Sequence, residues 1–225
     1  MKHFVKILNT DIKFPVNNIY CVGKNYSEHI KELGGKEIPE NPVIFLKPNS
    51  SLNSDNSDIS LPFLNGKPIS SDVHYETEIV VLISKDGYNI PEEEAFDYIY
   101  GFGIGLDLTL RDLQSVAKSK GLPWTTSKGF RGSAPVSQFI RKEDLPVSER
   151  LSFEMFKNGE LMQKADSSEM IFSIEKIVSY ISFMFGLSEG DLIFTGTPSG
   201  VGQIKSNDII SANLSGLVSL NLKVQ

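Results

Sequence analysis

The sequence has almost none of the side chains that covalent cross-links and soft metal clusters require. Its 225 residues include a single cysteine, Cys21, so neither an internal disulfide framework nor a thiolate metal cluster is expected. Cys21 lies within the apolar run Ile19–Gly23. We therefore expect a buried strand there, with a structural thiol rather than a nucleophile.

Long hydrophobic stretches and excess positive charge are also missing. No segment approaches the ~20 uninterrupted apolar residues that span a bilayer, and the N-terminus carries no apolar signal segment. We expect a cytoplasmic protein that does not bind membranes. Acidic side chains outnumber basic ones by 28 to 22, and the resulting net charge of −6 argues against nucleic-acid binding. A small anionic substrate is compatible with this charge, because a metal ion can reverse the local field.

The remaining composition is that of an ordinary globular chain, with 40% hydrophobic and 22% charged residues. We assign residues 1–225 to one domain, which opens with short strands over residues 1–16. Many short apolar segments, most of them without strict alternation, are separated by turn residues, and three or four segments have helical periodicity. This pattern predicts a β-rich α+β fold rather than a doubly wound one.

Three acidic residues stand beside apolar, strand-like runs. We predict one strand over residues 73–84, in which Glu76 and Glu78 precede the apolar run 79–83, and side chains two positions apart in a strand share a face. Asp107 follows the glycine-rich run 100–106. Three such carboxylates suggest a hard-cation site with oxygen ligands. The spacing of the two glutamates is equally typical of the solvated face of an antiparallel strand, so both readings stay open.

A short helix with a histidine–glutamate pair is predicted after the first buried strand. Ser27 can cap this helix and Gly34 can end it, and His29 and Glu32 share a face. A carboxylate fixes the histidine tautomer and stabilises the imidazolium, so the pair can act as a general base. An exposed polar helix with an incidental histidine is the alternative. The glycines and polar residues of segment 24–40 indicate a mobile lid.

Arg111 and Gln114 accompany Asp107. We predict a helix over residues 108–120, closed by Gly121, on whose first turns positions 107, 111 and 114 share a face. An arginine there can grip a carboxylate with two hydrogen bonds. A structural ion pair between Asp107 and Arg111 is the alternative reading.

Two loops have the composition of binding loops. Residues 122–135 are rich in glycine, proline and small polar residues around Trp124 and Lys128. Residues 195–202 form a glycine-rich turn that can present backbone N–H groups and the Thr197 hydroxyl to an anion. Since this turn has neither the lysine nor the helix of a P-loop, we do not expect a phosphate loop.

Two further elements read clearly from local sequence. Asn158-Gly159 between apolar segments predicts a tight hairpin. Ser173 is placed to cap a helix that ends near Phe185, with an apolar stripe that indicates core packing.

Seven motifs, in register from about residue 17 to the C-terminus, resemble the fumarylacetoacetate hydrolase superfamily. Two more, Gly121-Leu-Pro-Trp124-Thr and Ser168-Glu-Met-Ile-Phe172-Ser-Ile174, resemble its acylpyruvase and oxaloacetate decarboxylase branch. The seven motifs are Gly23-Lys-Asn25-Tyr26-x-x-His29-x-x-Glu32, Pro42-Val-Ile-Phe-Leu-Lys47-Pro48, His74-Tyr-Glu76-x-Glu78, Asp107-x-x-x-Arg111-Asp-x-Gln114, Lys128-Gly-Phe, Gly190-Asp191 and Thr195-Gly196-Thr197-Pro198-x-Gly200-Val-Gly202.

The resemblance implies a mixed β-sandwich roll with peripheral helices, a homodimer and a Mg²⁺ site, which Mn²⁺ or Ca²⁺ could also fill. It implies a set of metal ligands, a catalytic set and a substrate-binding set. The ligands would be Glu76, Glu78 and Asp107; the catalytic residues would be His29 and Glu32 on the lid, with Lys128 beside the substrate; the substrate-binding residues would be Lys24, Asn25, Arg111, Gln114 and Thr197.

The implied activity is that of a Mg²⁺-dependent hydrolase or lyase of 2-keto acids. It would hydrolyse acylpyruvates, decarboxylate oxaloacetate or do both through a metal-stabilised enolate, with the His–Glu dyad activating water. One alternative is an isomerase or decarboxylase of a 2-hydroxy-dienoate, of hydroxymuconate type, in aromatic catabolism. A non-catalytic, metal-stabilised dimeric interaction module is the other, and the intact set His29, Glu32 and Lys128 disfavours it.

Two departures from the family pattern concern specificity. Lys24 stands where relatives often carry arginine, and residues 131–134 differ from the commoner aromatic and acidic residues. We expect both to lie near the pocket and to influence which substrate is accepted.

Overall fold

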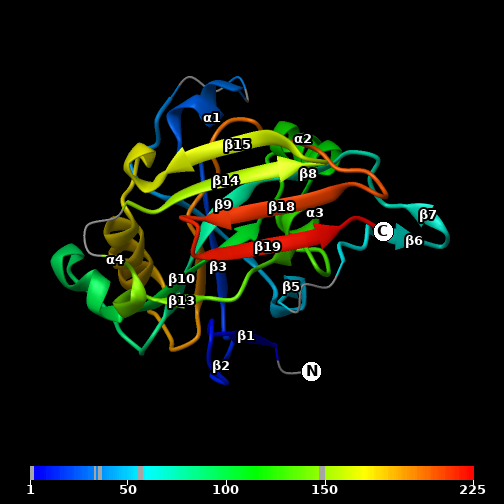
Figure 1. Cartoon of the computed structure of the whole chain (residues 1–225). Helices are drawn as coiled ribbons and strands as arrows, with labels where there is room; N and C mark the ends of the chain where they lie inside the picture. The colour runs from blue at the N-terminus through cyan, green and yellow to red at the C-terminus, as the bar shows by residue number, and fades with distance from the viewer. Residues whose placement is uncertain (1–2, 33, 35–36, 55–57, 147–149) are drawn as a thin grey trace.

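Two β-sheets packed face to face form the body of the protein (Figure 1). The computed structural model describes residues 3–32, 34, 37–54, 58–146 and 150–225. Short helices lie around the sheets, so the predicted β-rich α+β fold with peripheral helices is confirmed.

The larger sheet has six strands, and all its neighbours are antiparallel except the parallel pair β3 and β16. In spatial order its strands are β13 (Ile140–Arg141), β10 (Ile99–Leu106), β9 (Thr77–Ile83), β16 (Leu192–Phe194), β3 (Ile19–Gly23) and β4 (Val43–Lys47).

The second sheet has four antiparallel strands and lies in front of the first in Figure 1. In order these are β15 (Glu160–Asp166), β14 (Ser152–Lys157), β18 (Ile209–Leu214) and β19 (Val218–Lys223). Small sheets join β1 (Phe4–Lys6) to β2 (Lys13–Pro15), β11 (Thr109–Leu110) to β8 (Val73–Tyr75) and β17 (Gly202–Gln203), β12 (Ala134–Pro135) to β5 (Leu52–Asn53), and β6 (Phe63–Leu64) to β7 (Lys67–Pro68).

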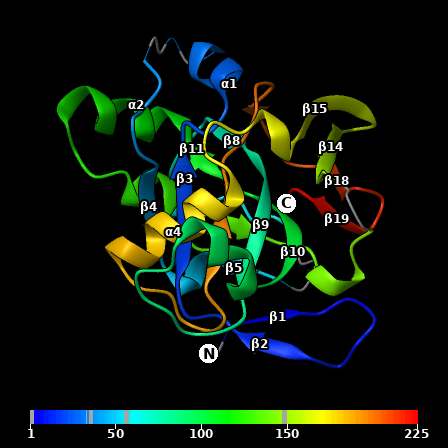
Figure 2. The same cartoon turned by 90° about the vertical axis from the view of Figure 1, so that its left-hand side faces the viewer.

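The helices are short. The α-helices are α1 (Ser27–Glu32), α2 (Arg111–Lys120), α3 (Thr125–Lys128) and α4 (Ile174–Met184), and the 3₁₀ turns are η1 (Asn49–Ser51), η2 (Glu92–Tyr98), η3 (Lys142–Asp144) and η4 (Ser167–Glu169). None of the helices in the described ranges is long and apolar enough to cross a membrane. In both views α1 and the β1–β2 hairpin lie at opposite ends of the molecule (Figures 1 and 2).

Strand β9 explains why so many strands lack an alternating pattern. All seven of its residues are buried. Ile79, Val81 and Ile83 pack into the core between the two sheets, whereas Val80 and Leu82 join a second apolar cluster on the opposite face. Because both faces of the strand are covered, both sets of side chains are apolar. Cys21 is buried in the second cluster, as expected of a structural thiol.

Several local predictions are confirmed. Asn158 and Gly159 both adopt positive φ, 54° and 83°, which is the conformation of a two-residue type I′ hairpin between β14 and β15. The Ser173 hydroxyl accepts a hydrogen bond from the backbone N–H of Lys176, so it caps α4 as predicted. The N-terminal hairpin is β1–β2, within the described residues from 3 onward.

Two boundaries and the burial of one strand differ from the predictions. The expected continuous strand over residues 73–84 breaks at Glu76, because β8 pairs with β11 and β17 while β9 belongs to the six-stranded sheet. Helix α2 begins at Arg111 rather than at residue 108, because Thr109 and Leu110 pair with β8. The apolar run 43–46 predicts a buried strand, but β4 is the edge of its sheet and is largely half-exposed.

The described part of the predicted lid, segment 24–40, contains α1. Residues 33, 35 and 36 of that segment lie outside the described residues.

Candidate active site

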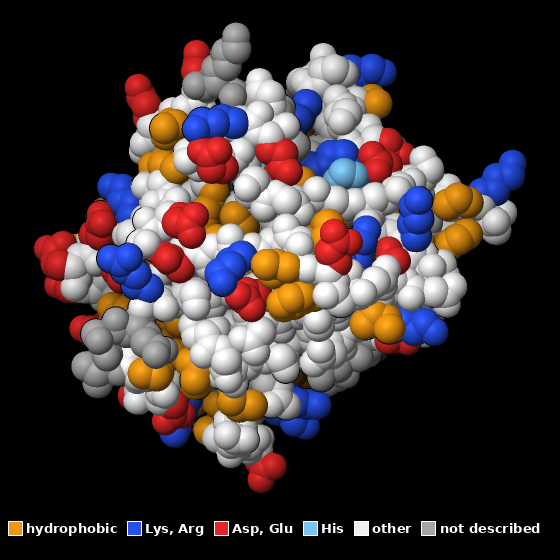
Figure 3. Space-filling model, turned by 45° about the horizontal axis from the view of Figure 1, so that its top comes forward, with side chains coloured by type: hydrophobic (Ala, Val, Ile, Leu, Met, Phe, Trp, Pro, Cys, Tyr) orange, Lys and Arg blue, Asp and Glu red, His pale blue; other side chains and the backbone are white. Residues whose placement is uncertain are grey.

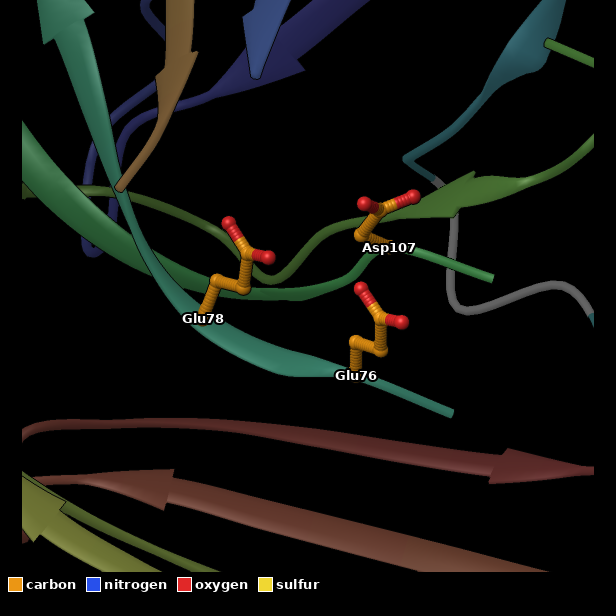
Figure 4. A group of neighbouring side chains, drawn as sticks. All are labelled: Glu76, Glu78 and Asp107. Atoms are coloured by element: carbon orange, nitrogen blue, oxygen red, sulfur yellow. The ribbon is translucent and has the colours of Figure 1, made fainter. Parts of the chain in front are cut away.

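Three buried carboxylates converge where the small β8 sheet meets the six-stranded sheet. Glu76 sits at the break between β8 and β9, Glu78 lies on β9, and Asp107 follows β10. One oxygen of each lies within 4.8 Å of the others, and the three side chains point toward a common space (Figure 4). The backbone N–H of Asp107 donates to the Glu76 carbonyl at 2.8 Å, which holds the two segments together. The reading of the two glutamates as a solvated face is therefore wrong.

Three cations face this cluster. Lys128 Nζ donates to Glu76 Oε2 at 2.7 Å and to Asp107 Oδ2 at 2.5 Å. Arg111 Nη2 donates to Glu76 Oε1 at 2.5 Å, so the alternative in which Arg111 simply pairs with Asp107 is not what the structure shows. The third cation is Lys47, whose Nζ lies 2.8 Å from Asp107 Oδ1.

Glu76 and Glu78 differ in how readily they ionise. Burial opposes ionisation of Glu76, but Lys128 and Arg111 outweigh it and hold its pKa well below the usual range. Burial and the negative charges of Asp107 and Glu76 raise the pKa of Glu78 well above its ordinary value. The hydrogen bond that Glu78 Oε2 accepts from the Gly196 N–H at 2.7 Å offsets this only in part.

The donor set fits a divalent cation. Lys47 approaches Asp107 Oδ1 outside hydrogen-bonding geometry, so within the described residues this buried oxygen has no hydrogen-bond donor. Glu78 lacks a cationic partner of its own among the ion pairs of the described residues. A cation between the three carboxylates would satisfy both groups, and an all-oxygen set suits Mg²⁺, Mn²⁺ or Ca²⁺.

The predicted His–Glu pair lies over the same site. His29 on α1 is buried, and its Nδ1 lies 3.1 Å from Glu32 Oε2. Glu32 Oε1 accepts a hydrogen bond from the backbone N–H of Gly200 at 3.0 Å. Because a carboxylate only accepts, Glu32 places the proton on Nδ1 and leaves Nε2 as the basic nitrogen. His29 is therefore buried rather than exposed, whereas its role in a catalytic dyad stays a prediction.

A cavity of about 30 Å³ joins these groups. Its walls include the carboxylates and most of the predicted site residues, namely Lys24, His29, Arg111, Gln114, Lys128 and Thr197. Gln114 Oε1 accepts from Arg111 Nη1 at 2.6 Å. Lys24 has a φ of 61°, in the left-handed region that few non-glycine residues adopt.

Asn25 is not among the residues that line this cavity. Its Nδ2 donates to the carbonyls of Phe172 and Thr195 at 3.1 and 2.8 Å, and its Oδ1 accepts from the Phe172 N–H at 2.7 Å. The residue expected to bind substrate thus clamps the end of β3 to two distant loops.

Segment 131–134 lies beside the site, where Ser133 Oγ donates to the Lys128 carbonyl at 2.8 Å, but it does not line the cavity. Phe130, Arg131 and Gly132 line a separate surface hollow, and Arg131 is exposed. Of the two departures from the family pattern, only Lys24 therefore borders the cavity. A larger hollow of about 710 Å³ flanks β4 and shares Phe45 and Trp124 with the cavity, but it contains none of the three carboxylates.

The family model "Fumarylacetoacetate (FAA) hydrolase C-terminal" matches residues 18–225. The chain belongs to the fumarylacetoacetate hydrolase family. It is 46% identical over 208 residues to the mouse protein named oxaloacetate tautomerase FAHD1, mitochondrial, covering 92% of this chain and 91% of the relative. It is 42% identical over 200 residues to the mitochondrial oxaloacetate decarboxylase of Dictyostelium discoideum, covering 88% and 89% of the two chains.

A solved structure of the family extends the likeness to the fold. The crystal structure of fumarylpyruvate hydrolase from Pseudomonas aeruginosa, in complex with Mn²⁺ and pyruvate, has a TM-score of 0.91 and 33% sequence identity to this chain. The match covers 99% of this chain and 95% of the other. The predicted family and the prediction of an enzyme are confirmed.

In this member of the fumarylacetoacetate hydrolase family, three side chains of the site were missed at the sequence level. Lys118, which lines the cavity, lies on the same face of α2 as Arg111 and Gln114, so helical spacing could have found it. Gln163 on β15 donates to Thr197 Oγ1 at 2.9 Å and accepts from the Thr77 N–H at 3.0 Å. In the sequence, Lys47 looks like an ordinary polar residue at the end of a strand. Neither Lys47 nor Gln163 carries a local signal of its role.

Proposed function

We propose that this protein is a divalent-metal-dependent enzyme of small 2-keto acids, with oxaloacetate as the first candidate substrate. The observation that supports this most is the convergence of three buried carboxylates with Lys128, Arg111 and His29, which is paired with Glu32, around one cavity. The names of the relatives agree, because they act on oxaloacetate or fumarylpyruvate.

Glu76, Glu78 and Asp107 are the proposed metal ligands, and we propose Mg²⁺ as the resident ion, with Mn²⁺ or Ca²⁺ as substitutes. When bound, the ion supplies a Lewis acid for the negative charge that develops on the keto oxygen of the substrate. The all-oxygen donor set and the Mn²⁺ in the related fumarylpyruvate hydrolase support this choice.

The surrounding cations would bind and orient the anionic substrate. Arg111 offers a planar fork that matches a carboxylate, and Lys128 adds a positive charge beside the keto group. Lys24, Gln114 and Thr197 complete the walls of the pocket. A cavity of about 30 Å³ holds an ion or a water molecule but not a keto acid, so substrate entry requires movement of a wall. Helix α1, within the predicted lid, is the wall that we expect to move.

The dyad would move protons. Glu32 holds Nδ1–H of His29, and the N–H of Gly200 holds Glu32, so Nε2 of His29 is the group free to take a proton. In tautomerisation, Nε2 removes a proton from the carbon beside the keto group and returns it to oxygen, or the reverse. In hydrolysis of an acylpyruvate, the same nitrogen would take a proton from the attacking water. In decarboxylation no water attacks, and the dyad would protonate the product carbon.

Acylpyruvate hydrolysis is the second candidate, because the fumarylpyruvate hydrolase with a TM-score of 0.91 cleaves a related class of substrate according to its name. A hydroxymuconate-type isomerase is less favoured. The solved 5-carboxymethyl-2-hydroxymuconate delta-isomerase from Mycobacterium smegmatis has a TM-score of 0.79, below the 0.91 of the fumarylpyruvate hydrolase, and 78% of its chain is matched, at 31% identity.

A single side-by-side assay tests these functions. The protein with Mg²⁺, Mn²⁺ or Ca²⁺ is given oxaloacetate, acetylpyruvate and a hydroxymuconate-type dienoate, and enol–keto exchange, CO₂ release and C–C cleavage are followed separately. We expect metal-dependent turnover of oxaloacetate, and measurable cleavage of acetylpyruvate if hydrolysis is a second activity. Full turnover in the presence of a chelator contradicts the metal-dependent mechanism.

We further propose that the active form is a homodimer, which sedimentation analysis at several protein concentrations tests directly. The cellular location stays a prediction: we expected the cytoplasm, whereas the named mouse and Dictyostelium relatives are mitochondrial.

A further inference from the structure

Arg111 is held by three acceptors, and one of them comes from outside the predicted site. Its Nη2 donates to Glu76 Oε1 at 2.5 Å and its Nη1 donates to Gln114 Oε1 at 2.6 Å. The third nitrogen, Nε, lies 3.5 Å from Nδ1 of His74 on β8. Glu76 and Gln114 line the cavity, but His74 does not.

His74 is itself fixed by Asp72. The Nε2 nitrogen of its ring lies 2.8 Å from Asp72 Oδ1. A carboxylate only accepts hydrogen bonds, so Nε2 of a neutral His74 carries the proton and Nδ1 presents a lone pair to Arg111. Asp72 therefore selects the one neutral tautomer that can accept a hydrogen bond from Nε of Arg111.

The backbone aligns the same three residues. The carbonyl of Asp72 accepts a hydrogen bond from the N–H of Arg111 at 2.8 Å. His74 pairs with Thr109 in the β8–β11 ladder, two residues before Arg111. Because Thr109 and Leu110 pair with β8, α2 begins at Arg111. The same pairing brings His74 beside the guanidinium.

We propose that Asp72 and His74 are positioning residues that orient Arg111 for binding the substrate carboxylate. A guanidinium has five N–H donors, and within the described residues three of them have protein acceptors. One donor on each terminal nitrogen is left, and the two oxygens of a substrate carboxylate can accept from these two donors. The inference rests on the proposed function, in which Arg111 binds a carboxylate of a 2-keto acid.

The role of His74 predicts which kinetic constant changes when it is lost. Without an acceptor at Nε, the guanidinium can turn about its long axis and offer a different pair of donors. A carboxylate that does not react is bound equally in the ground state and the transition state, so weaker binding raises KM and leaves kcat unchanged.

Three substitutions test the pair. His74→Phe keeps a flat ring but removes the acceptor, and Asp72→Ala releases the ring from its orientation. We expect each to raise KM for oxaloacetate by about tenfold, as for loss of a hydrogen bond to a charged group, with kcat within about twofold. His74→Asn places an amide oxygen near the position of Nδ1, so its KM should stay within about threefold of the wild-type value.

Two controls separate positioning from a loosened strand. Gln203→Ala removes the 2.6 Å hydrogen bond from Gln203 Nε2 to the Ser71 carbonyl at the same strand, without touching Arg111, and should leave KM unchanged. In an Arg111→Lys background there is no Nε–H at this position, so His74→Phe should add nothing further to KM. Binding of Mn²⁺, measured by calorimetry, should be equal in wild type, His74→Phe and Asp72→Ala.

The outcomes are distinct. An unchanged KM in both His74→Phe and Asp72→Ala, or equal loss in His74→Asn and His74→Phe, overturns the inference while the proposed function stands. Additive effects of His74→Phe and Arg111→Lys also overturn it. A wild-type protein that neither turns over keto acids nor binds oxalate with Mg²⁺ overturns the proposed function and this inference together.

Discussion

Lys47 is a charged residue whose side chain is shielded from solvent. Its side chain is completely buried, and Nζ lies 2.8 Å from Asp107 Oδ1 and donates to Ser133 Oγ at 3.0 Å and to the carbonyls of Leu108 and Lys128. One lysine therefore joins β4 to the proposed metal ligand and to the loop that carries Lys128. Removing it takes one of two cations away from the buried Asp107 carboxylate and removes a hydrogen-bond donor from three buried acceptors.

We predict that Lys47→Met lowers the free energy of unfolding by about 3–5 kcal/mol, the usual cost of breaking a buried ion pair by removing one partner. Urea unfolding at a fixed metal concentration measures it. Lys164→Met is the matched control, because Lys164 also makes a 2.8 Å ion pair, with Glu154, but in solvent. An exposed pair contributes little, so this control should not change the midpoint measurably. Equal effects of the two substitutions would contradict the role of Lys47.

Loss of the His29 side chain should slow proton transfer without weakening metal binding. We predict that His29→Ala lowers kcat by about 10²–10⁴, the range for loss of a general base, while Mn²⁺ binding stays at the wild-type level. Glu32→Gln should show a smaller loss, because an amide oxygen can still accept from Nδ1. Rates of enol–keto exchange and of acetylpyruvate cleavage, together with calorimetry, measure both effects. Turnover within a few-fold of wild type in His29→Ala would remove the dyad from the mechanism.

At the scale of single residues, the sequence predicts which residues carry the chemistry more reliably than it predicts which residues contact one another. Residue types and motif order were enough to select Glu76, Glu78, Asp107, His29 and Lys128, and the structure brings all five to one cavity. Lys47 and Asn25 show the limit. A lysine at a strand end and an asparagine beside a turn look alike whether they are solvated, structural or functional, because their partners are distant in sequence.

At the scale of elements, Asn25 holds α1 in place. Its side chain makes three hydrogen bonds, to the backbone of Phe172 and Thr195, at distances between 2.7 and 3.1 Å. These bonds tie the chain just before α1 to the loop ahead of α4 and to the strand end that leads into residues 195–202. Residues 195–202 include Gly200, whose backbone N–H donates to Glu32. Asn25 therefore links the start of α1, which carries His29 and Glu32, to the segment that holds Glu32 in place.

We predict that Asn25→Ala lowers the free energy of unfolding by about 3 kcal/mol, since three buried hydrogen bonds of about 1 kcal/mol each are lost. KM for oxaloacetate should change by less than about twofold in the protein that remains folded. Thermal unfolding and steady-state kinetics on the same preparation separate the two roles. A tenfold higher KM with unchanged stability would instead support direct substrate binding by Asn25.

The elements that sequence predicted poorly are those decided by pairing partners. Local signals gave the hairpin at Asn158 and the helix after Ser173 correctly, because turn and cap residues act on their own neighbours. The break at Glu76 depends on β11 and β17 competing with the six-stranded sheet for one run of chain. A continuous apolar pattern does not reveal that two sheets share it, so the prediction of one strand over 73–84 was wrong.

At the scale of the whole molecule, the same limit applies to sheet order. The abundance of short strands predicted a β-rich fold, but the order β13-β10-β9-β16-β3-β4 joins strands from both ends of the chain and follows from tertiary packing. From the sequence, the arrangement of the sheets could be predicted only through the family resemblance. On the surface, acidic and basic side chains are interspersed over the face shown in Figure 3. Inside the protein, three cations face the three carboxylates, but Glu78 has no cationic partner of its own among the ion pairs of the described residues, so a buried charge there is not compensated.

That buried charge should make the stability of the whole protein depend on metal. Three carboxylates within 4.8 Å repel one another, and a cation that binds only the folded state relieves the repulsion and stabilises the fold. A ligand present at 100 times its Kd adds about 2.7 kcal/mol. For a chain of this size each 1 kcal/mol raises Tm by roughly 2–4 °C, so we predict an increase of about 5–10 °C on adding Mg²⁺ or Mn²⁺, reversed by a chelator. Asp107→Asn should remove most of the increase, whereas Glu154→Gln, at an exposed pair, should keep it. A Tm that is independent of metal concentration in the wild-type protein would mean that the carboxylates do not form the metal site.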